Sequence, residues 1–249
     1  MNEFSQSLDR LLAEQCPPAR VREIERGASP DGLWRQLEQS GFLDALAPAE
    51  RGGAGLGLAE AFELFTLEGR HALPIAMARE MAARALGATE LPRALGAVVT
   101  AAQMVGALER VLELSVAFAN QREQFGRPIG KFQAVQHQLA VMAEQVAAAR
   151  MAAQIGCQGE ALLPDTLHAA VAKSRASAAA AIVAPMAHAI HGAIGVTAEL
   201  DLHLYTRRLH RWRGEYGSEH AWNLILGQAV LAADQPLALD FMRASLLAE

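Results

Sequence analysis

The sequence has few aromatic residues, few cysteines and no excess of basic charge. Aromatics make up only 5% of its 249 residues, so the core must come from many small aliphatic contacts, as in closely packed helices. Two cysteines, Cys16 and Cys157, are too few for a disulfide framework and predict a reduced, cytoplasmic setting. A formal net charge of −5 argues against a general nucleic-acid binder, because such proteins neutralise phosphates with basic side chains.

Targeting patterns and long apolar runs are also scarce. The first residues, MNEFSQSLDRLLAEQ, carry acids early and have no long apolar core, so they do not resemble a secretory signal. The most apolar stretch, AAAAIVAPMAHAI, is interrupted by Pro185 and His188 and falls short of the ~18 uninterrupted apolar residues of a membrane span. We therefore expect no membrane span. The 52% hydrophobic content still predicts a sizeable folded core.

Strand signals are nearly absent, whereas helical periodicity runs through the chain. We find no convincing alternating apolar–polar run, and no Asn-Gly or Asp-Gly pair joins two such runs as a hairpin turn. Long apolar stripes near 97–121, 131–159 and 164–191 predict helices, and their alanines and glycines let helix axes approach closely. The sequence predicts an all-α fold, with an N-terminal helical domain (1–93) and a C-terminal up-and-down helical bundle (94–249).

The segment NQREQFGRPIGKFQAVQHQL, residues 120–139, interrupts this pattern with an unusual composition. A helix–helix connection needs only a few polar residues and a glycine. Here Arg122 offers a forked guanidinium suited to a pyrophosphate, and Gln124 and Gln133 offer amide donors and acceptors. Phe125 and Phe132 offer flat apolar surface. From these residues alone, a charged surface turn with both phenylalanines buried is the simpler interpretation.

Four segments, in order, resemble the acyl-CoA dehydrogenases, flavoenzymes that desaturate acyl-CoA thioesters. REQFGRPIGKFQAVQH resembles the family signature, and AIHGAIGVTAELDLHLYTRRL is similar to its Q-x-H-G-G-x-G-x-T segment. SGFLDALAPAERGGAGLGLAEAFELFTLEGR is similar to the N-terminal helical domain of the family. WRGEYGSEHAW occupies the place of the loop with the catalytic glutamate. The resemblance covers nearly all of the chain from about Gly32 and implies FAD as cofactor.

The resemblance also implies roles for individual residues. The adenine and pyrophosphate half of an FAD, typically one centred in a neighbouring subunit, would be held by Arg122, Gln124, Phe125, Ile129 and Gln133. Gly192, in the HGAIGVT turn, would lie beside the same ligand. Glu215 falls where the family has the base that removes the α-proton while a hydride leaves the β-carbon. The alternative interpretation of Glu215 is an exposed loop acid near the N-terminus of a helix. Ser218 would cap that helix.

The chain departs from the family in several places. Members normally carry a middle β-barrel of on the order of a hundred residues, whereas the 74–94 segment is far shorter and has a helical pattern. Ala189 replaces a glutamine, and Ala97 replaces an arginine near the CoA. Tyr216 replaces a glycine, where its ring would reshape the pocket or contact the substrate. His188 and His191 lie three apart, but no further ligand cluster indicates a metal site.

Three functions remain open on this basis. The first is an FAD-dependent acyl-CoA dehydrogenase, complete as a homo-oligomer or with a barrel-bearing subunit, passing electrons to an electron-transferring flavoprotein. The second is a non-catalytic helical partner that completes the FAD site of a full-length dehydrogenase, and the third is a flavin-free CoA-ester binder. The 122–133 loop favours the two functions that involve a flavin. Glu215 favours the catalytic dehydrogenase, whereas the missing barrel, Ala189 and Ala97 favour the non-catalytic partner. Small apolar residues around most of each long helix also predict an oligomer.

Overall fold

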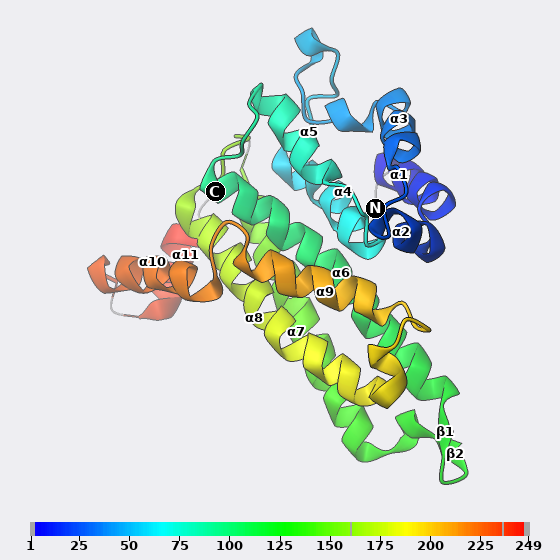
Figure 1. The fold of residues 1–249 in the computed structure, drawn as a ribbon. Coiled ribbons are helices and arrows are strands. Elements are labelled where there is room, and N and C mark those ends of the chain that lie inside the picture. The colour runs from blue at the N-terminus through cyan, green and yellow to red at the C-terminus, as the bar shows by residue number, and fades with distance from the viewer. Residues whose placement is uncertain (1–2, 160, 236, 247–249) are drawn as a thin grey trace.

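The computed structural model describes residues 3–159, 161–235 and 237–246, and this part of the chain is helical apart from one small hairpin (Figure 1). The helices are α1 (Glu3–Gln15), α2 (Pro18–Glu25), α3 (Asp31–Gln39), α4 (Leu58–Arg70), α5 (Met77–Leu86), α6 (Arg93–Gln121), α7 (Gln133–Gly156), α8 (Thr166–His191), α9 (Leu202–Gly214), α10 (Glu219–Ala232) and α11 (Ala238–Leu246). Short 3₁₀ helices are η1 (Phe42–Asp44), η2 (Ala49–Arg51), η3 (Ile129–Lys131) and η4 (Gly192–Val196). Strands β1 (Glu123–Gln124) and β2 (Arg127–Pro128) form the hairpin. The predicted all-α fold is confirmed.

Helix α6 is the centre of the molecule, packing against α4, α7, α8 and α9 (Figure 1). Its approach to α4 depends on two glycines. A Cβ on Gly106 would lie 1.8 Å from the Thr66 carbonyl oxygen, and a Cβ on Gly69 would lie 1.8 Å from the Gln103 carbonyl oxygen. Neither helix can therefore accept even a methyl group at this crossing, because the atoms that would clash belong to the backbone.

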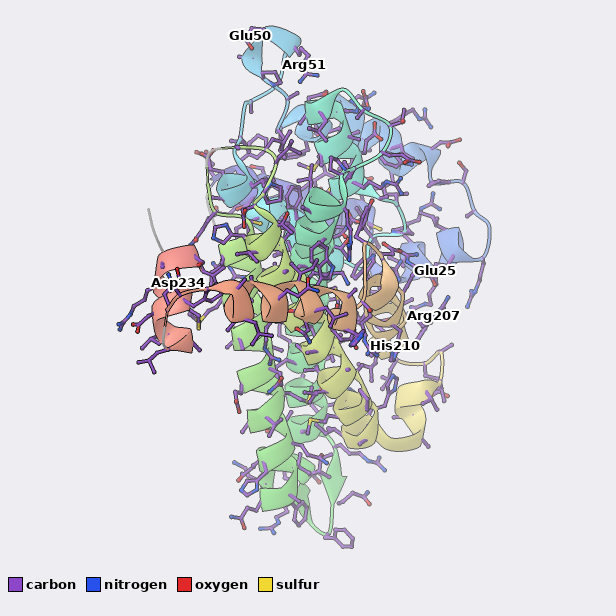
Figure 2. The ribbon with its side chains drawn as sticks, turned by 90° about the vertical axis from the view of Figure 1, so that its left-hand side faces the viewer. Glu25, Glu50, Arg51, Arg207, His210 and Asp234 are labelled. Atoms are coloured by element: carbon purple, nitrogen blue, oxygen red, sulfur yellow. The ribbon has the colours of Figure 1, made fainter. Side chains whose placement is uncertain are left out.

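The N-terminal helices pack onto one end of the bundle, and α5 occupies the segment expected to be helical between α4 and α6 (Figure 1). Glu25 of α2 and Arg207 of α9 lie beside each other at this junction (Figure 2), with Oε2 of Glu25 3.4 Å from Nη1 of Arg207. Buried residues from both halves of the chain form one continuous cluster, running from Leu8 to Trp222. The division into domains at residues 93 and 94 stays a prediction.

Two helices are long and apolar enough to cross a membrane by length and composition alone, which the sequence expectation did not anticipate. In α6, 83% of the most apolar window is buried inside the protein, as in the core helix of a globular protein. In the helical stretch Thr166–Val196 the corresponding share is 44%. The expected absence of a membrane span stays a prediction.

Helix α10 runs across the long bundle rather than along it, and α11 lies beside its far end (Figures 1 and 2). Trp222 is the buried residue of α10, and it anchors this helix to the rest of the core. Leu224, Val230 and Leu231 on the same helix are 54%, 40% and 88% exposed. Helix α10 therefore presents an apolar surface to solvent.

Candidate functional site

The 120–139 segment forms a hairpin at one end of the bundle, between α6 and α7 (Figure 1). Gln124 pairs with Arg127, and the turn residues Phe125 and Gly126 have φ values of 53° and 76°. Positive φ at both positions is the geometry of a type I′ turn, which accounts for the glycine. Phe125 is 92% exposed at the tip, with its ring centroid 6.1 Å from that of Phe132. The simpler interpretation of this segment, a turn that buries both phenylalanines, does not hold for Phe125.

A groove of about 460 Å³ opens between this hairpin and the C-terminal end of α8. It is lined by Phe118, Arg122, Gln124, Ile129, Ile190, His191, Gly192, Ala193 and Ile194. The structure therefore brings together Arg122, Gln124, Ile129 and Gly192, four of the residues expected to bind the cofactor. Phe125 and Gln133 are both exposed and do not line the groove.

The floor of the groove is flat and uncharged. The rings of Phe118 and His191 stack with centroids 4.4 Å apart and an interplanar angle of 28°. Burial lowers the pKa of His191, whose Nδ1 lies 2.8 Å from the Ala187 carbonyl oxygen and donates to it. The imidazole is therefore neutral at physiological pH. The pairing was not predicted, although His191 lies within the AIHGAIGVT segment and Phe118 lies just before the 120–139 segment.

The rim of the groove carries the cationic side chain of Arg122 and the backbone of Gly192, which no side chain covers. Arg122 is exposed there, and within the described residues it forms no ion pair. Gly192 has a φ of 64°, and no atom lies within 4 Å of where its Cβ would stand. A free guanidinium, the Gln124 amide and an aromatic floor are the groups that a dinucleotide needs for its pyrophosphate and its ring. The residues present therefore fit the adenine and pyrophosphate half of FAD.

A second cavity, of about 170 Å³, lies beside Glu215. Its lining residues are Glu68, Ala76, Arg79, Leu91, Gly96, Val99, Thr100, Gln103, Arg211, Trp212, Glu215 and Tyr216. The Glu215 side chain is 41% exposed, and its Oε1 is 3.1 Å from Nε of Arg211 one turn earlier. Glu215 and Tyr216 thus share one cavity, as the resemblance implies for a base and a substrate contact.

The turn that bears Glu215 has an unusual backbone. Tyr216 has a φ of 56°, a left-handed conformation that is rare outside glycine, and Gly217 has a φ of 112°. The Tyr216 ring packs directly on Gly96 of α6, where a Cβ would lie 2.2 Å from its Cε1 atom. The glycine that the family has at position 216 is therefore exchanged for a tyrosine whose ring fits only because residue 96 is a glycine.

Arg93, which sequence reasoning missed, also contacts this turn. Its Nε donates to the Tyr216 carbonyl oxygen at 3.3 Å, and its guanidinium lies 4.4 Å from the centroid of the Trp222 ring. Trp222 Nε1 donates to the same carbonyl at 3.2 Å. The arginine expected at position 97 is absent, but this one stands a helical turn earlier. Ser218 caps α10 as predicted, accepting from the Ala221 N–H at 3.4 Å.

Glu68 is a second carboxyl group in the Glu215 cavity that the sequence did not indicate. It is 3% exposed and accepts the Ala78 N–H at 2.6 Å, so it caps the first turn of α5. Burial raises the pKa of Glu68 to about 7, although the Ala78 N–H, Gln103 and Arg208 act in the opposite direction. Glu68 is one of three glutamates on α4, with Glu60 and Glu63, and the sequence does not show which of the three is buried.

The two histidines with ligand-like spacing have other contacts. His188 Nε2 lies 3.0 Å from the Thr206 hydroxyl, and His191 stacks on Phe118 as described above. Across the residues that the structure covers, no group of three or more His, Cys, Asp or Glu side chains is arranged to hold a metal ion.

The groove and the Glu215 cavity lie well apart in one chain. The hairpin stands at one end of the long bundle, whereas the turn between α9 and α10 lies toward the other (Figure 1). A ligand seated in the hairpin groove therefore does not reach Glu215 of the same chain by a short path.

Family comparisons agree with the motifs. The model of the acyl-CoA dehydrogenase C-terminal domain matches residues 94–231, and that of the N-terminal domain matches residues 1–108. The chain belongs to the acyl-CoA dehydrogenase family. Acyl-CoA dehydrogenase IpdE2 of Mycobacterium tuberculosis is 42% identical over 114 residues, which are 46% of this chain and 35% of that protein. FadE34 of the same organism is 40% identical over 131 residues, 51% of this chain and 18% of FadE34. These matches thus span about a third or less of the relatives.

Solved structures show which members share the whole fold. A chain of the ChsE4–ChsE5 complex from Mycobacterium tuberculosis superposes with a TM-score of 0.82 at 18% identity, covering 94% of this chain and 99% of that one. A chain of the Tcur3481–Tcur3483 steroid acyl-CoA dehydrogenase variant superposes with a TM-score of 0.81 at 20% identity, covering 92% of this chain and 97% of that one. Butyryl-CoA dehydrogenase of Megasphaera elsdenii gives only 0.51 at 29% identity, with 62% of this chain matching 38% of that enzyme. Chains of similar length, rather than the larger dehydrogenases, therefore share this architecture from end to end.

Proposed function

We propose that this chain is one subunit of an FAD-dependent acyl-CoA dehydrogenase that desaturates an acyl-CoA thioester between its α and β carbons. We further propose that its partner is a dehydrogenase subunit carrying the middle β domain. The observation that carries the proposal is the separation of the hairpin groove from Glu215 within one chain (Figure 1). Each half-site needs a second chain to complete it, and only together do they make a desaturase site.

In the hairpin groove, Arg122 would pair with the pyrophosphate, and the Gln124 amide would bond a neighbouring oxygen. The Phe118–His191 floor and Ile129 would cover the apolar face of the ligand. When bound, FAD supplies the acceptor for the hydride that leaves the β-carbon. The side chains of this chain only bind and orient it, and they keep water from its buried face.

At the second half-site, Glu215 would take the proton from the α-carbon of the substrate. The Tyr216 ring, packed on Gly96, forms one wall of that cavity, and Trp212 and Val99 contribute apolar surface. Arg211 pairs with Glu215 in the free chain, so a bound substrate would have to displace this ion pair before the carboxylate could accept a proton. A partner subunit seated over the cavity would exclude water from the carboxylate.

The assembly and its setting belong to the same proposal. The exposed apolar side chains on α10 and α11, among them Leu231 and Leu239, offer a surface for another dehydrogenase subunit. An electron-transferring flavoprotein would then accept the electrons. Burial raises the pKa of Cys16 to about 11 and that of Cys157 to about 12, so both stay as unreactive thiols. The two free cysteines are the basis for proposing a cytoplasmic setting.

A non-catalytic partner is the second candidate, because Glu215 is 41% exposed and is paired with Arg211 in the free chain. A visible spectrum distinguishes the candidates in two steps. The chain is purified alone and after co-expression with the product of a neighbouring dehydrogenase gene. Flavin bands only in the co-expressed sample support the two-subunit site, and anaerobic bleaching of that sample by acyl-CoA supports catalysis. A complex that retains flavin but is never bleached favours the non-catalytic partner. Colourless protein in both samples contradicts both candidates.

A further inference from the structure

Lys173 of α8 is a charged side chain in the interior of the protein. It is 0% exposed, although a buried ammonium is costly unless hydrogen bonds compensate for lost water. It is also one of only two lysines in a chain with 22 basic side chains, so arginine is the usual choice of cation here. The identity of this residue therefore needs a local reason.

The contacts of Lys173 supply that reason. Its Nζ donates to the Ser177 hydroxyl at 2.9 Å, to the Arg213 carbonyl oxygen at 2.9 Å and to the Gly217 carbonyl oxygen at 3.1 Å. The two carbonyls stand on either side of Glu215. An ammonium has three donors pointing in different directions and matches three acceptors in this way, whereas the planar guanidinium of arginine does not.

The turn that these bonds span needs support from outside. Arg213 and Gly214 form the last turn of α9, where carbonyl groups lack helical partners. Tyr216 then adopts a left-handed conformation, which costs energy for a residue with a Cβ. Lys173 binds the Arg213 carbonyl before this strained stretch and the Gly217 carbonyl after it. The orientation of Glu215 is therefore fixed relative to helix α8.

The charge itself is not needed for packing. Burial lowers the pKa of Lys173 to about 8, although the nearby carboxylates Glu219 and Glu215 favour the ammonium; Arg213 opposes it. At neutral pH the protein therefore keeps a desolvated cation where a methionine of similar length would fill the space. A side chain kept at such a cost beside one turn indicates a role in that turn.

We propose that Lys173 is a positioning residue that holds the 213–217 turn, and so the Glu215 carboxylate, in its proton-accepting orientation. This rests on the proposed function in so far as Glu215 is the base. Lys173 reaches no reacting atom and acts only through the two carbonyls.

The first experiment measures the turn itself, without cofactor or substrate. Hydrogen–deuterium exchange is compared in the purified wild-type chain, Lys173→Met, Lys173→Arg and Ser177→Ala. We expect peptides that contain 214–217 to exchange ~10-fold faster in both Lys173 variants, with the rest of α8 unchanged. Ser177→Ala is the matched control, because it removes a Lys173 bond that does not reach the turn. Unchanged exchange at 214–217, or faster exchange along all of α8, would overturn the proposal.

The second experiment follows anaerobic flavin bleaching by acyl-CoA in the co-expressed complex. We expect Lys173→Met to slow bleaching ~10-fold or more while the Kd of acyl-CoA changes by less than ~3-fold. The bleaching rate of the wild-type complex should fall above about pH 8 as Lys173 loses its proton. The bleaching rate of Lys173→Met should not show this fall. Equal rates in both proteins would overturn the inference. A wild-type complex that is never bleached would instead contradict the proposed catalysis, and hydrogen exchange would then decide on the turn alone.

Discussion

At the scale of single residues, Arg122 is the clearest test of the hairpin groove. It is exposed on a connection rather than packed in a helix, so replacing it should cost little stability. A charge-assisted bond to a pyrophosphate is worth ~1.5–3 kcal/mol, so Arg122→Ala should weaken flavin retention by roughly 10- to 100-fold. Flavin occupancy of the complex after gel filtration measures this. Arg127→Ala is the matched control, because Arg127 belongs to the same hairpin but stacks 4.3 Å from the Phe132 centroid, outside the groove. Equal occupancy in both variants would make Arg122 an ordinary surface cation.

Glu215 is tested by removing its ability to accept a proton. Glu215→Gln is nearly isosteric, so fold, flavin and acyl-CoA binding should persist. The rate of anaerobic flavin bleaching should fall by ~10²–10⁴-fold, the usual contribution of a general base. Glu144→Gln, at an exposed position on α7, serves as the control. Bleaching at the wild-type rate in Glu215→Gln would mean that the base lies elsewhere, for example on the partner chain.

The raised pKa of Glu68 predicts that the free energy of unfolding depends on pH. Its pKa is raised from 4.5 to about 7 in the folded state, so the folded protein binds more protons than the unfolded chain between these values. The contribution of Glu68 is fully present below about pH 4.5 and is lost as the pH rises through about 7, a change of about 3 kcal/mol in the free energy of unfolding. Urea unfolding between pH 4.5 and 8 should show this slope in the wild type and not in Glu68→Gln. The exposed Glu14→Gln is the control; a persistent slope in Glu68→Gln would assign it to other groups.

At the scale of elements, the crossing of α4 and α6 depends on glycine. Gly106→Ala would place a Cβ 1.8 Å from the Thr66 carbonyl oxygen, so the two helices must separate. We expect a loss of ~1–3 kcal/mol or more in the free energy of unfolding, measured as a lower Tm.

The matched control for Gly106 is Gly227→Ala in α10. No atom lies within 4 Å of a Cβ there, so only helix propensity changes, with an expected gain of up to ~1 kcal/mol. A loss of similar size in both variants would show that the effect is not caused by the crossing.

At the scale of the whole molecule, the exposed apolar side chains predict self-association or association with a partner. Light scattering at micromolar concentration should give a mass above that of one chain, which is 26.6 kDa. Leu224→Glu combined with Leu231→Glu should lower this mass, because both side chains are more than half exposed on α10. Met151→Glu, on the exposed side of α7, tests whether any apolar surface has the same effect. A wild-type mass of one chain, alone and with the dehydrogenase partner, would contradict the prediction.

The sequence by itself determined the helical class, the long helices and the family. Helical periodicity is local, so the apolar stripes predicted α6, α7 and α8 to within a few residues, except that α6 begins four residues before the expected start at 97. The 120–139 segment and the glutamate loop were recognisable because each is a contiguous motif, although the sequence did not predict that the first of them forms a hairpin. Ser218 was predicted as a cap for the same reason, since its partner is three residues away.

Only the tertiary structure decided which distant residues meet. Glu68 and Glu215 share a cavity, and the Tyr216 ring depends on Gly96, because α4 and α9 both pack against α6. Lys173 was one residue in an alanine-rich helix until the fold placed its ammonium between the carbonyls of Arg213 and Gly217. The separation of the groove from Glu215 is likewise set by helix lengths and packing, which no local pattern encodes (Figure 1). Such contacts join residues far apart in the chain, so they follow from how the helices pack and not from the order of the residues within any one of them.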